Sequence, residues 1–246
     1  MDHAAPATSR LRSPLWIVTV AAVLIALGWD LLGWDLHVMR LIAQARGFDL
    51  RHHWLLESVL HHQVRQWAIG LFLALLVVTV MPLGSWRRLS VRQRLTMAVG
   101  VSLALLAVNI IKRASLTSCP WELAEFGGAA HYVSHWSWGV LDGGSGRCFP
   151  GGHASSTLAF LPVGLVWLHA DERADRRRGR WWIVAALASG LLLGAVQTLR
   201  GAHYPSHTVW SALICWMVAL GTQRAFSMWP TAAKAPGQGQ ASGAVN

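Results

Sequence analysis

The chain has 246 residues, of which 54% are hydrophobic and only 13% carry a charge, and 15 of them are tryptophan. This composition is too apolar for a soluble domain of this length and predicts a membrane protein. The formal net charge of +10 does not point to nucleic acid, because the basic residues cluster in loops between apolar runs, where they set membrane orientation. We therefore expect the membrane bilayer as a partner and exclude nucleic acid.

Six apolar runs are candidates to cross a hydrocarbon core of roughly 30 Å. In chain order they cover residues 15–32, 67–82, 95–111, 155–169, 181–199 and 208–223. The first is longer than a signal-peptide core and lacks a small-residue cleavage site, so we expect a retained anchor. The pattern predicts an all-α membrane bundle of about six helices in one domain, 15–227, between an N-terminal tail, 1–14, and a disordered C-terminal tail, 228–246.

Basic side chains gather in the N-terminal tail, in the second and fourth loops and after the last run. They are Arg10, Arg12, Arg87, Arg88, Arg92, Arg94, Arg173, Arg176, Arg177, Arg178, Arg180, Arg224 and Lys234. With six spans all of these segments lie on one side, which the positive-inside rule makes cytoplasmic. We therefore expect a multi-pass protein of a bacterial inner membrane with both termini in the cytoplasm.

Two of the loops that then face outwards are long. In the first, 33–66, apolar residues recur at helical spacing and predict an interfacial amphipathic helix; they are Trp54, Leu55, Leu56, Val59 and Leu60. The third, 112–154, is the longest stretch without an apolar run and is dense in Gly, Trp and His. Long structured loops are usually functional.

The cysteines fit this topology. Cys119 and Cys148 both fall in the third loop, on the oxidising side of a bacterial inner membrane, and we predict a disulfide between them. Two free buried thiols are the alternative. Cys215 lies within the sixth run and indicates ordinary packing.

The 12 histidines avoid the middle of the apolar runs. A transmembrane b-type cytochrome needs paired axial histidines at depth, and this chain offers none. His153 instead stands at the outer start of the fourth run, and His203 and His207 at the outer start of the sixth. Lys112 and Arg200 stand at the outer ends of the third and fifth runs. This convergence predicts a site at the outer face.

These residue types suit phosphate chemistry. Lys and Arg bind phosphate oxygens, and in "CFPGGHASS", residues 148–156, Gly151 and Gly152 would let backbone N–H groups approach an anion at a helix N-terminus. One histidine can attack phosphorus while another protonates the leaving oxygen, so no cofactor or metal is required. The alternative is an ordinary turn before a helix capped by Ser155 or Ser156.

Residues 110–210 resemble the type 2 phosphatidic acid phosphatase superfamily. Its motif K-x6-R-P appears as "KRASLTSCP", with Lys112 and Pro120 in register and Cys119 in place of the arginine. Its motif P-S-G-H appears as "PGGH", with Gly151 in place of the serine and His153 retained. The variants resemble a divergent branch of membrane-associated bacterial members.

The third motif, S-R-x5-H-x3-D, appears as "VQTLRGAHYPSH". His203 matches the nucleophile of the family, whereas Val196, Gln197 and His207 replace its serine, arginine and aspartate. The resemblance implies a six-helix bundle with its site at the outer membrane surface. It also implies that His203 forms a phosphohistidine.

By the same resemblance, His153 would act as general acid and Lys112 would bind phosphate oxygens. Arg200 is the first substitute for the missing arginines, because it lies one helical turn after Gln197, and Arg113 and Arg147 are the second choices. The role of the missing aspartate stays open at this point. The candidates are His207, Asp142, Glu122 and Glu125. Pro205 is expected to open the sixth helix, with His203 just outside it.

The sequence therefore favours a lipid phosphatase acting on a phosphomonoester or diphosphate headgroup at the outer leaflet. Substrates implied by the resemblance are a polyprenyl diphosphate (undecaprenyl diphosphate), a lipid A phosphate and glycerophospholipids such as phosphatidic acid and phosphatidylglycerol phosphate. A lipid-phosphate phosphotransferase and a non-catalytic lipid-phosphate-binding relative are alternatives. A membrane metal or haem protein that uses the loop histidines is a further one.

Overall fold

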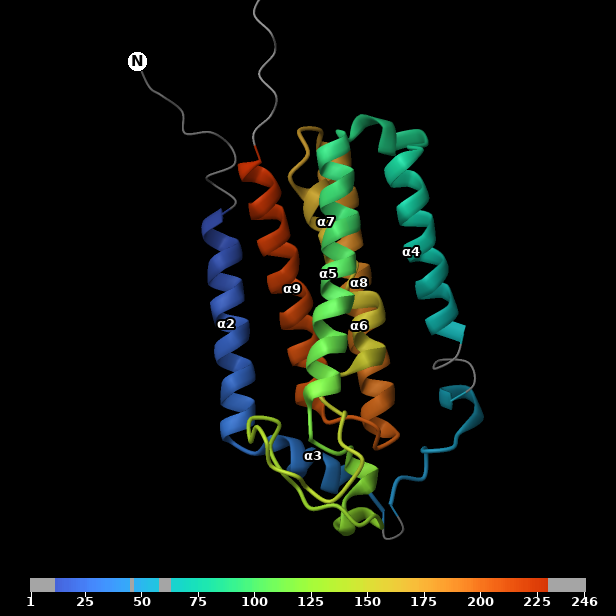
Figure 1. The fold of residues 1–246 in the computed structure, drawn as a ribbon, viewed down its shortest axis with the longest axis vertical. Helices are drawn as coiled ribbons and strands as arrows, with labels where there is room; N and C mark the ends of the chain where they lie inside the picture. Colours follow the sequence, from blue (N-terminus) through green and yellow to red (C-terminus); the bar gives the residue numbers. More distant parts are fainter. Residues whose placement is uncertain (1–11, 45–46, 58–62, 230–246) are drawn as a thin grey trace, which may run out of the picture.

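The computed structural model describes residues 12–44, 47–57 and 63–229. Within these ranges the secondary structure is helical, with isolated bridges and no β-strand. The long helices run side by side along the long axis of the molecule (Figure 1). The predicted all-α class is confirmed.

Each predicted apolar run is helical. The helices are α2 (Arg12–Leu31), α3 (Trp34–Ile42), α4 (Val64–Val80), α5 (Val91–Ala114), α6 (Gly152–Leu158), α7 (Leu161–Leu168), α8 (Arg173–Leu199) and α9 (Pro205–Met228), and the 3-10 turns are η2 (Gly84–Arg88), η3 (Pro120–Glu122) and η4 (Ala124–Phe126). The fourth run is broken into α6 and α7, and Pro162 lies in the first turn of α7, where it offers no N–H to continue α6.

The helices identify a membrane protein. Helices α5 and α8 are each long and apolar enough to cross a bilayer, and α2 with α3, which are bent by 69° at their junction, form a third span if taken together. Helix α4 and the α6–α7 stretch are apolar but shorter. Six crossings stay a prediction.

The core of the bundle lies between α5, α7, α8 and α9, where Met97, Val101, Leu165 and Trp167 are buried. Helix α4 packs on α5 and buries only Leu75 among the side chains that are described for it. Most other apolar side chains of α4 are exposed, whereas Phe72 and Val78 pack against the core; a largely exposed apolar surface is expected for a helix in contact with lipid.

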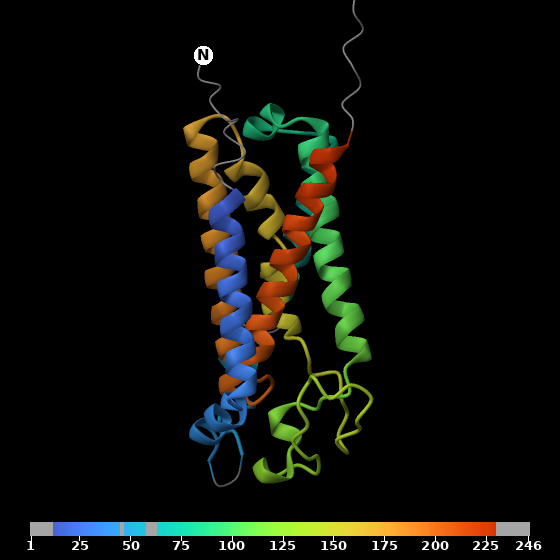
Figure 2. The ribbon, with the colours of Figure 1, turned by 90° about the vertical axis from the view of Figure 1, so that its left-hand side faces the viewer.

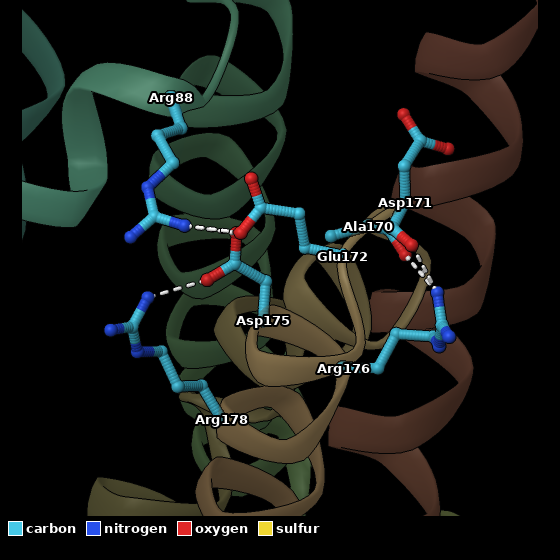
Figure 3. Close-up of polar contacts among 7 residues, drawn as sticks. All are labelled: Arg88, Ala170, Asp171, Glu172, Asp175, Arg176 and Arg178. Carbon is cyan, nitrogen blue, oxygen red and sulfur yellow. Dashed lines mark hydrogen bonds and ion pairs between the residues drawn. The ribbon is translucent and has the colours of Figure 1, made fainter.

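The molecule has two distinct ends (Figures 1 and 2). The basic end carries the start of α2, η2, the α7–α8 turn and the end of α9. Arginines fold back there onto neighbouring groups (Figure 3): Arg88 Nη1 lies 2.5 Å from Glu172 Oε2, Arg178 Nη1 lies 2.5 Å from Asp175 Oδ1, and Arg176 donates to backbone carbonyls of the preceding turn. The loop end carries α3, the 115–151 segment and the α8–α9 connection.

The first long loop contains a regular helix, α3, that was not predicted. The described part of the predicted interfacial helix, residues 54–57, is helical, and Val59 and Leu60 lie outside the described residues. Helix α3 is short and carries a buried carboxylate, Asp35. A polar group on the buried face breaks the apolar periodicity on which the prediction depends.

Candidate active site

A tight connection between α8 and α9 holds His203. Helix α8 ends before Gly201, which adopts a left-handed φ of 73° and whose Cβ, if present, would lie 2.2 Å from the Phe48 ring. Glycine is therefore required by backbone conformation and by space. Pro205 opens α9, which confirms that His203 lies just outside this helix.

His203 is 6% exposed, and its Nδ1 lies 3.4 Å from the sulfur of Cys148. A disulfide sulfur carries no proton and can only accept, so this contact requires the proton of the neutral imidazole on Nδ1. The Nε2 lone pair is then free. This is the tautomer that a histidine nucleophile needs.

The predicted disulfide is confirmed. Cys119 and Cys148 are bonded, with their Cα atoms 5.1 Å apart and a sequence separation of 29. The bond ties the start of the 115–151 segment to the residues just before α6. Cys148 is fully buried, so the disulfide forms part of the wall against which His203 rests.

His207 is fully buried in the first turn of α9 and contacts the same residue, Cys148. Its Nδ1 lies 3.1 Å from the carbonyl oxygen of Cys148, which also requires a proton on Nδ1. Its Nε2 has no hydrogen-bond partner among the described residues. The His203 and His207 rings lie 5.7 Å apart, centre to centre, as packing neighbours.

Two groups act electrostatically on His203. Burial lowers the pKa of His203 well below its ordinary value, and the charges of Lys112 and then His153 lower that pKa further. The Lys112 side chain reaches across α6, since a Cβ on Gly152 would lie 3.6 Å from Lys112 Cε. Half-buried His153 follows in the first turn of α6. The loop end thus brings together four residues that were predicted from the sequence: His203, Lys112, Gly152 and His153.

The double glycine needs a correction. The N–H of Gly151 donates to the carbonyl oxygen of His207 over 3.1 Å, and the carbonyl of Gly151 accepts from Ser211 Oγ over 3.0 Å. Gly151 therefore joins α6 to α9 and has no N–H left for phosphate, contrary to prediction. Gly152 is the first residue of α6, where backbone N–H groups lack intrahelical acceptors.

Of the three arginine candidates, one is buried and two are exposed. Arg200 is 4% exposed and donates to the carbonyl of Arg51 over 3.0 and 3.1 Å and to Gln197 Oε1 over 3.3 Å. These bonds use three of its five N–H groups. Arg113 and Arg147 are exposed, and the backbone of Arg147 is left-handed with φ 59°.

The acidic candidates for the role of the missing aspartate bind other groups. Asp142 accepts from the N–H and hydroxyl of Ser118 at 2.6 and 2.7 Å, Glu122 accepts from the N–H of Cys119 at 2.8 Å, and Glu125 pairs with Arg40. These contacts organise the loop. Instead, Cys148 lies beside His203 Nδ1, where the family aspartate would orient the imidazole ring. A main-chain carbonyl or a disulfide sulfur in this role cannot be recognised from a motif of side-chain types.

Sequence reasoning missed the donor at Gln197. This residue replaces a family arginine, is 2% exposed, and its Nε2 has no hydrogen-bond partner among the described residues. Arg200, which can only donate, contacts the amide oxygen and thereby fixes the orientation of the amide. The alignment with the family motif could have indicated this residue, because Gln197 precedes His203 by the same number of residues as the family arginine precedes the nucleophile.

Among the described residues, two groups of side chains have the proximity that metal binding requires. The first is Cys119, Cys148 and His203, but its sulfurs are bonded to each other and offer no thiolate. The second is Asp30, Asp35 and His135, which lies beside the histidine site.

Comparison with known proteins agrees with this geometry. A model of the PAP2 superfamily matches residues 94–230, which is more than half of the chain. Comparisons with curated proteins and with solved structures find no significant match. The matched region runs from the start of α5 through α9 and includes Lys112, His153 and His203. The chain therefore belongs to the PAP2 superfamily.

Proposed function

We propose that the protein is a lipid phosphatase that hydrolyses a phosphomonoester or diphosphate headgroup on the outer leaflet of a bacterial inner membrane, through a phosphohistidine at His203. Membership of the PAP2 superfamily supports a phosphatase-type activity. The observation that carries the proposal is the environment of His203: a buried ring whose Nδ1 faces Cys148, with Lys112 and His153 close enough to act on its charge.

In the first step the Nε2 lone pair of His203 attacks phosphorus. A P–N bond forms while the P–O bond to the leaving group breaks, and protonated His153 gives its proton to the departing oxygen. The leaving group is the lipid alcohol of a monoester or the lipid monophosphate of a diphosphate. Cys148 holds Nδ1–H and keeps the attacking lone pair on Nε2.

In the second step water replaces the lipid. Neutral His153 removes a proton from the water as its oxygen attacks phosphorus, the P–N bond breaks, and inorganic phosphate leaves. His153 ends protonated and His203 regains its lone pair, so both return to their starting forms. If an alcohol attacks in place of water, the product is a phosphorylated acceptor, which is the phosphotransferase alternative.

The negative charge on the transferred phosphoryl group must be stabilised by a positive charge and by hydrogen-bond donors. Lys112 supplies the positive charge, and the N–H of Gly152 and the Nε2 of Gln197 supply neutral hydrogen bonds. An uncharged amide stabilises the transition state less than an arginine does. We therefore expect this enzyme to depend strongly on Lys112.

The test is release of inorganic phosphate by purified protein in detergent, with EDTA present. The panel would contain a polyprenyl diphosphate, a lipid A phosphate, phosphatidylglycerol phosphate and phosphatidic acid. Wild type is expected to hydrolyse at least one of them, and His203→Ala and His153→Ala to lose that activity. His131→Ala is the matched control, because His131 is an exposed histidine of the 115–151 segment.

The alternatives give different results. Disappearance of substrate without inorganic phosphate, but with a phosphorylated acceptor, identifies a phosphotransferase. Folded protein that binds lipid phosphate without turnover, and keeps this binding in His203→Ala, identifies a binding relative and refutes catalysis.

A further inference from the structure

Three buried titratable side chains outside the histidine site come together at the loop end. Asp30 is near the end of α2, Asp35 is in α3, and His135 is in the 115–151 segment. One ligand atom from each lies within 4.8 Å of the others. We propose that these residues bind one divalent transition-metal ion, of which zinc fits best, and that the ion fastens the α2–α3 pair to the 115–151 segment.

Two atoms of this group lack hydrogen-bond partners. The side chains of His135 and Asp30 are 4% and 6% exposed, and His135 Nε2 lies 3.4 Å from Asp30 Oδ2. That contact is an ion pair when His135 is protonated, and neither His135 Nε2 nor Asp30 Oδ1 has a well-formed hydrogen bond among the described residues. Buried polar atoms left unpaired are costly, and a metal ion between them would supply the missing interaction.

The charge of the group has one cationic partner among the described residues: His135, whose Nε2 lies 3.4 Å from Asp30 Oδ2 and which carries a charge only when protonated. Neutral N–H and O–H donors surround the two carboxylates, and no lysine or arginine pairs with either in the part of the chain that the structure describes. The donors are Trp136 and Trp210 for Asp30, and Trp29 and Ser206 for Asp35. Two neighbouring buried carboxylates are unfavourable without a cation, and a divalent ion offsets both charges.

The ligand types select the metal. One imidazole with two carboxylates suits zinc, whereas magnesium and calcium prefer oxygen ligands alone. Ligand atoms about 2 Å from a tetrahedral zinc ion lie about 3.3 Å apart. His135 Nε2 approaches the Asp30 carboxylate to 3.4 Å, measured to Oδ2, and Oδ1 of the same carboxylate is the oxygen without a hydrogen-bond partner among the described residues.

The position of the group indicates a structural role. The His135 ring stacks on Phe149 at 4.2 Å, centre to centre, just before the "PGGH" turn. Asp35 accepts from the N–H of Ser206 at the start of α9. An ion here would order both segments that carry the catalytic histidines without joining the reaction, so the proposal stands independently of the lipid phosphatase activity.

The experiment measures bound metal, using the full chain in detergent after prolonged chelation. Zinc is returned by equilibrium dialysis and counted by elemental analysis. Wild type and the control His131→Gln are expected to bind about one zinc ion per chain, and His135→Gln and Asp30→Asn less than about a tenth of that. Zinc should also raise the thermal unfolding midpoint of wild type and His131→Gln but not of His135→Gln.

His135→Gln decides the outcome, because it changes a loop side chain and leaves both carboxylates with their hydrogen bonds. Helical circular dichroism and a single gel-filtration peak establish that it is folded. Wild type that takes up no zinc, or folded His135→Gln that binds zinc as wild type does, would overturn the proposal. Neither measurement reads phosphate release, so failure here is distinct from failure of the phosphatase proposal.

Discussion

His203 is buried among groups that oppose its protonation, and this affects stability as well as chemistry. Its pKa is lowered from the ordinary value by burial, then by Lys112 and His153. A group with a lowered pKa in the folded protein takes up a proton more readily when unfolded. Stability from this source is therefore complete above the unfolded pKa of about 6.5 and is lost as the pH falls below it.

We predict that wild type is destabilised on acidification from pH 7 to pH 5 more steeply than His203→Gln, which cannot take up this proton. The difference in slope approaches at most about 1.4 kcal/mol per pH unit. Thermal unfolding in detergent across this range measures it. Parallel curves for the two proteins would show that His203 titrates normally in the folded state.

Gln197 is a buried donor at a position where the family has an arginine. We predict that Gln197→Leu lowers kcat/KM about 100-fold, the usual loss for one donor to a developing negative charge. Gln223→Leu is the control, because Gln223 is a partly buried glutamine near the end of α9 that is remote from His203. Equal activities of the two variants would remove Gln197 from the site.

The sequence can point to site residues whose chemistry depends on side-chain type. His203, His153 and Lys112 are predicted because a motif and a topology agree on them, and the structure brings them near one another; their roles stay predictions. Gly151 was assigned wrongly because its N–H has a main-chain partner, the carbonyl of His207, and no residue pattern encodes such a partner. Arg200 was favoured by helical spacing, but its contact with the Arg51 carbonyl depends on tertiary structure.

At the level of elements, α8 and α9 approach most closely at Gly194, next to the hairpin that holds His203. A Cβ there would lie 2.3 Å from the Cγ2 and Oγ1 atoms of Thr208. Helices in membranes associate through such small residues. Thr208 packs directly against the backbone of Gly194, which leaves no room for a side chain there.

We predict that Gly194→Ala destabilises the protein by about 1–3 kcal/mol, and that Thr208→Ala in the same chain restores part of the loss, because it removes the two closest atoms. Gly70→Ala in α4, where a Cβ meets nothing within 4 Å, serves as control and should be neutral or slightly stabilising. Unfolding midpoints of the four proteins test this. Equal effects at Gly194 and Gly70 would contradict the close packing.

The apolar runs predicted where the helices lie because apolar composition is a local property. The break between α6 and α7 and the bend between α2 and α3 were not predicted. Both depend on interactions between elements. Pro162 abuts α5 at Gly100, and the carboxylates of Asp30 and Asp35 are held by tryptophans and Ser206 from distant segments.

At the scale of the whole molecule, the basic end and the loop end lie at opposite ends of the bundle (Figures 1 and 2). The positive-inside rule then predicts that the basic end is cytoplasmic. The disulfide at the loop end agrees with an oxidising compartment on that side.

We predict that a membrane-impermeant maleimide labels Ser145→Cys in intact spheroplasts, and labels Ala174→Cys only after permeabilisation. Both residues are exposed, one in the 115–151 segment and one at the start of α8. Wild type is the control, because its cysteines are disulfide-bonded or buried. Labelling of Ala174→Cys alone in intact spheroplasts would reverse the orientation and place the site in the cytoplasm.

If His203 carries the phosphoryl group, the phosphohistidine can be trapped. Purified protein would be mixed briefly with lipid substrate labelled with ³²P in its phosphate and quenched in alkali, in which phosphohistidine is stable. We predict protein-bound label that acid releases, present in wild type and His131→Ala and absent from His203→Ala. Label that persists in His203→Ala, or full hydrolysis by that variant, would show that His203 is not the nucleophile.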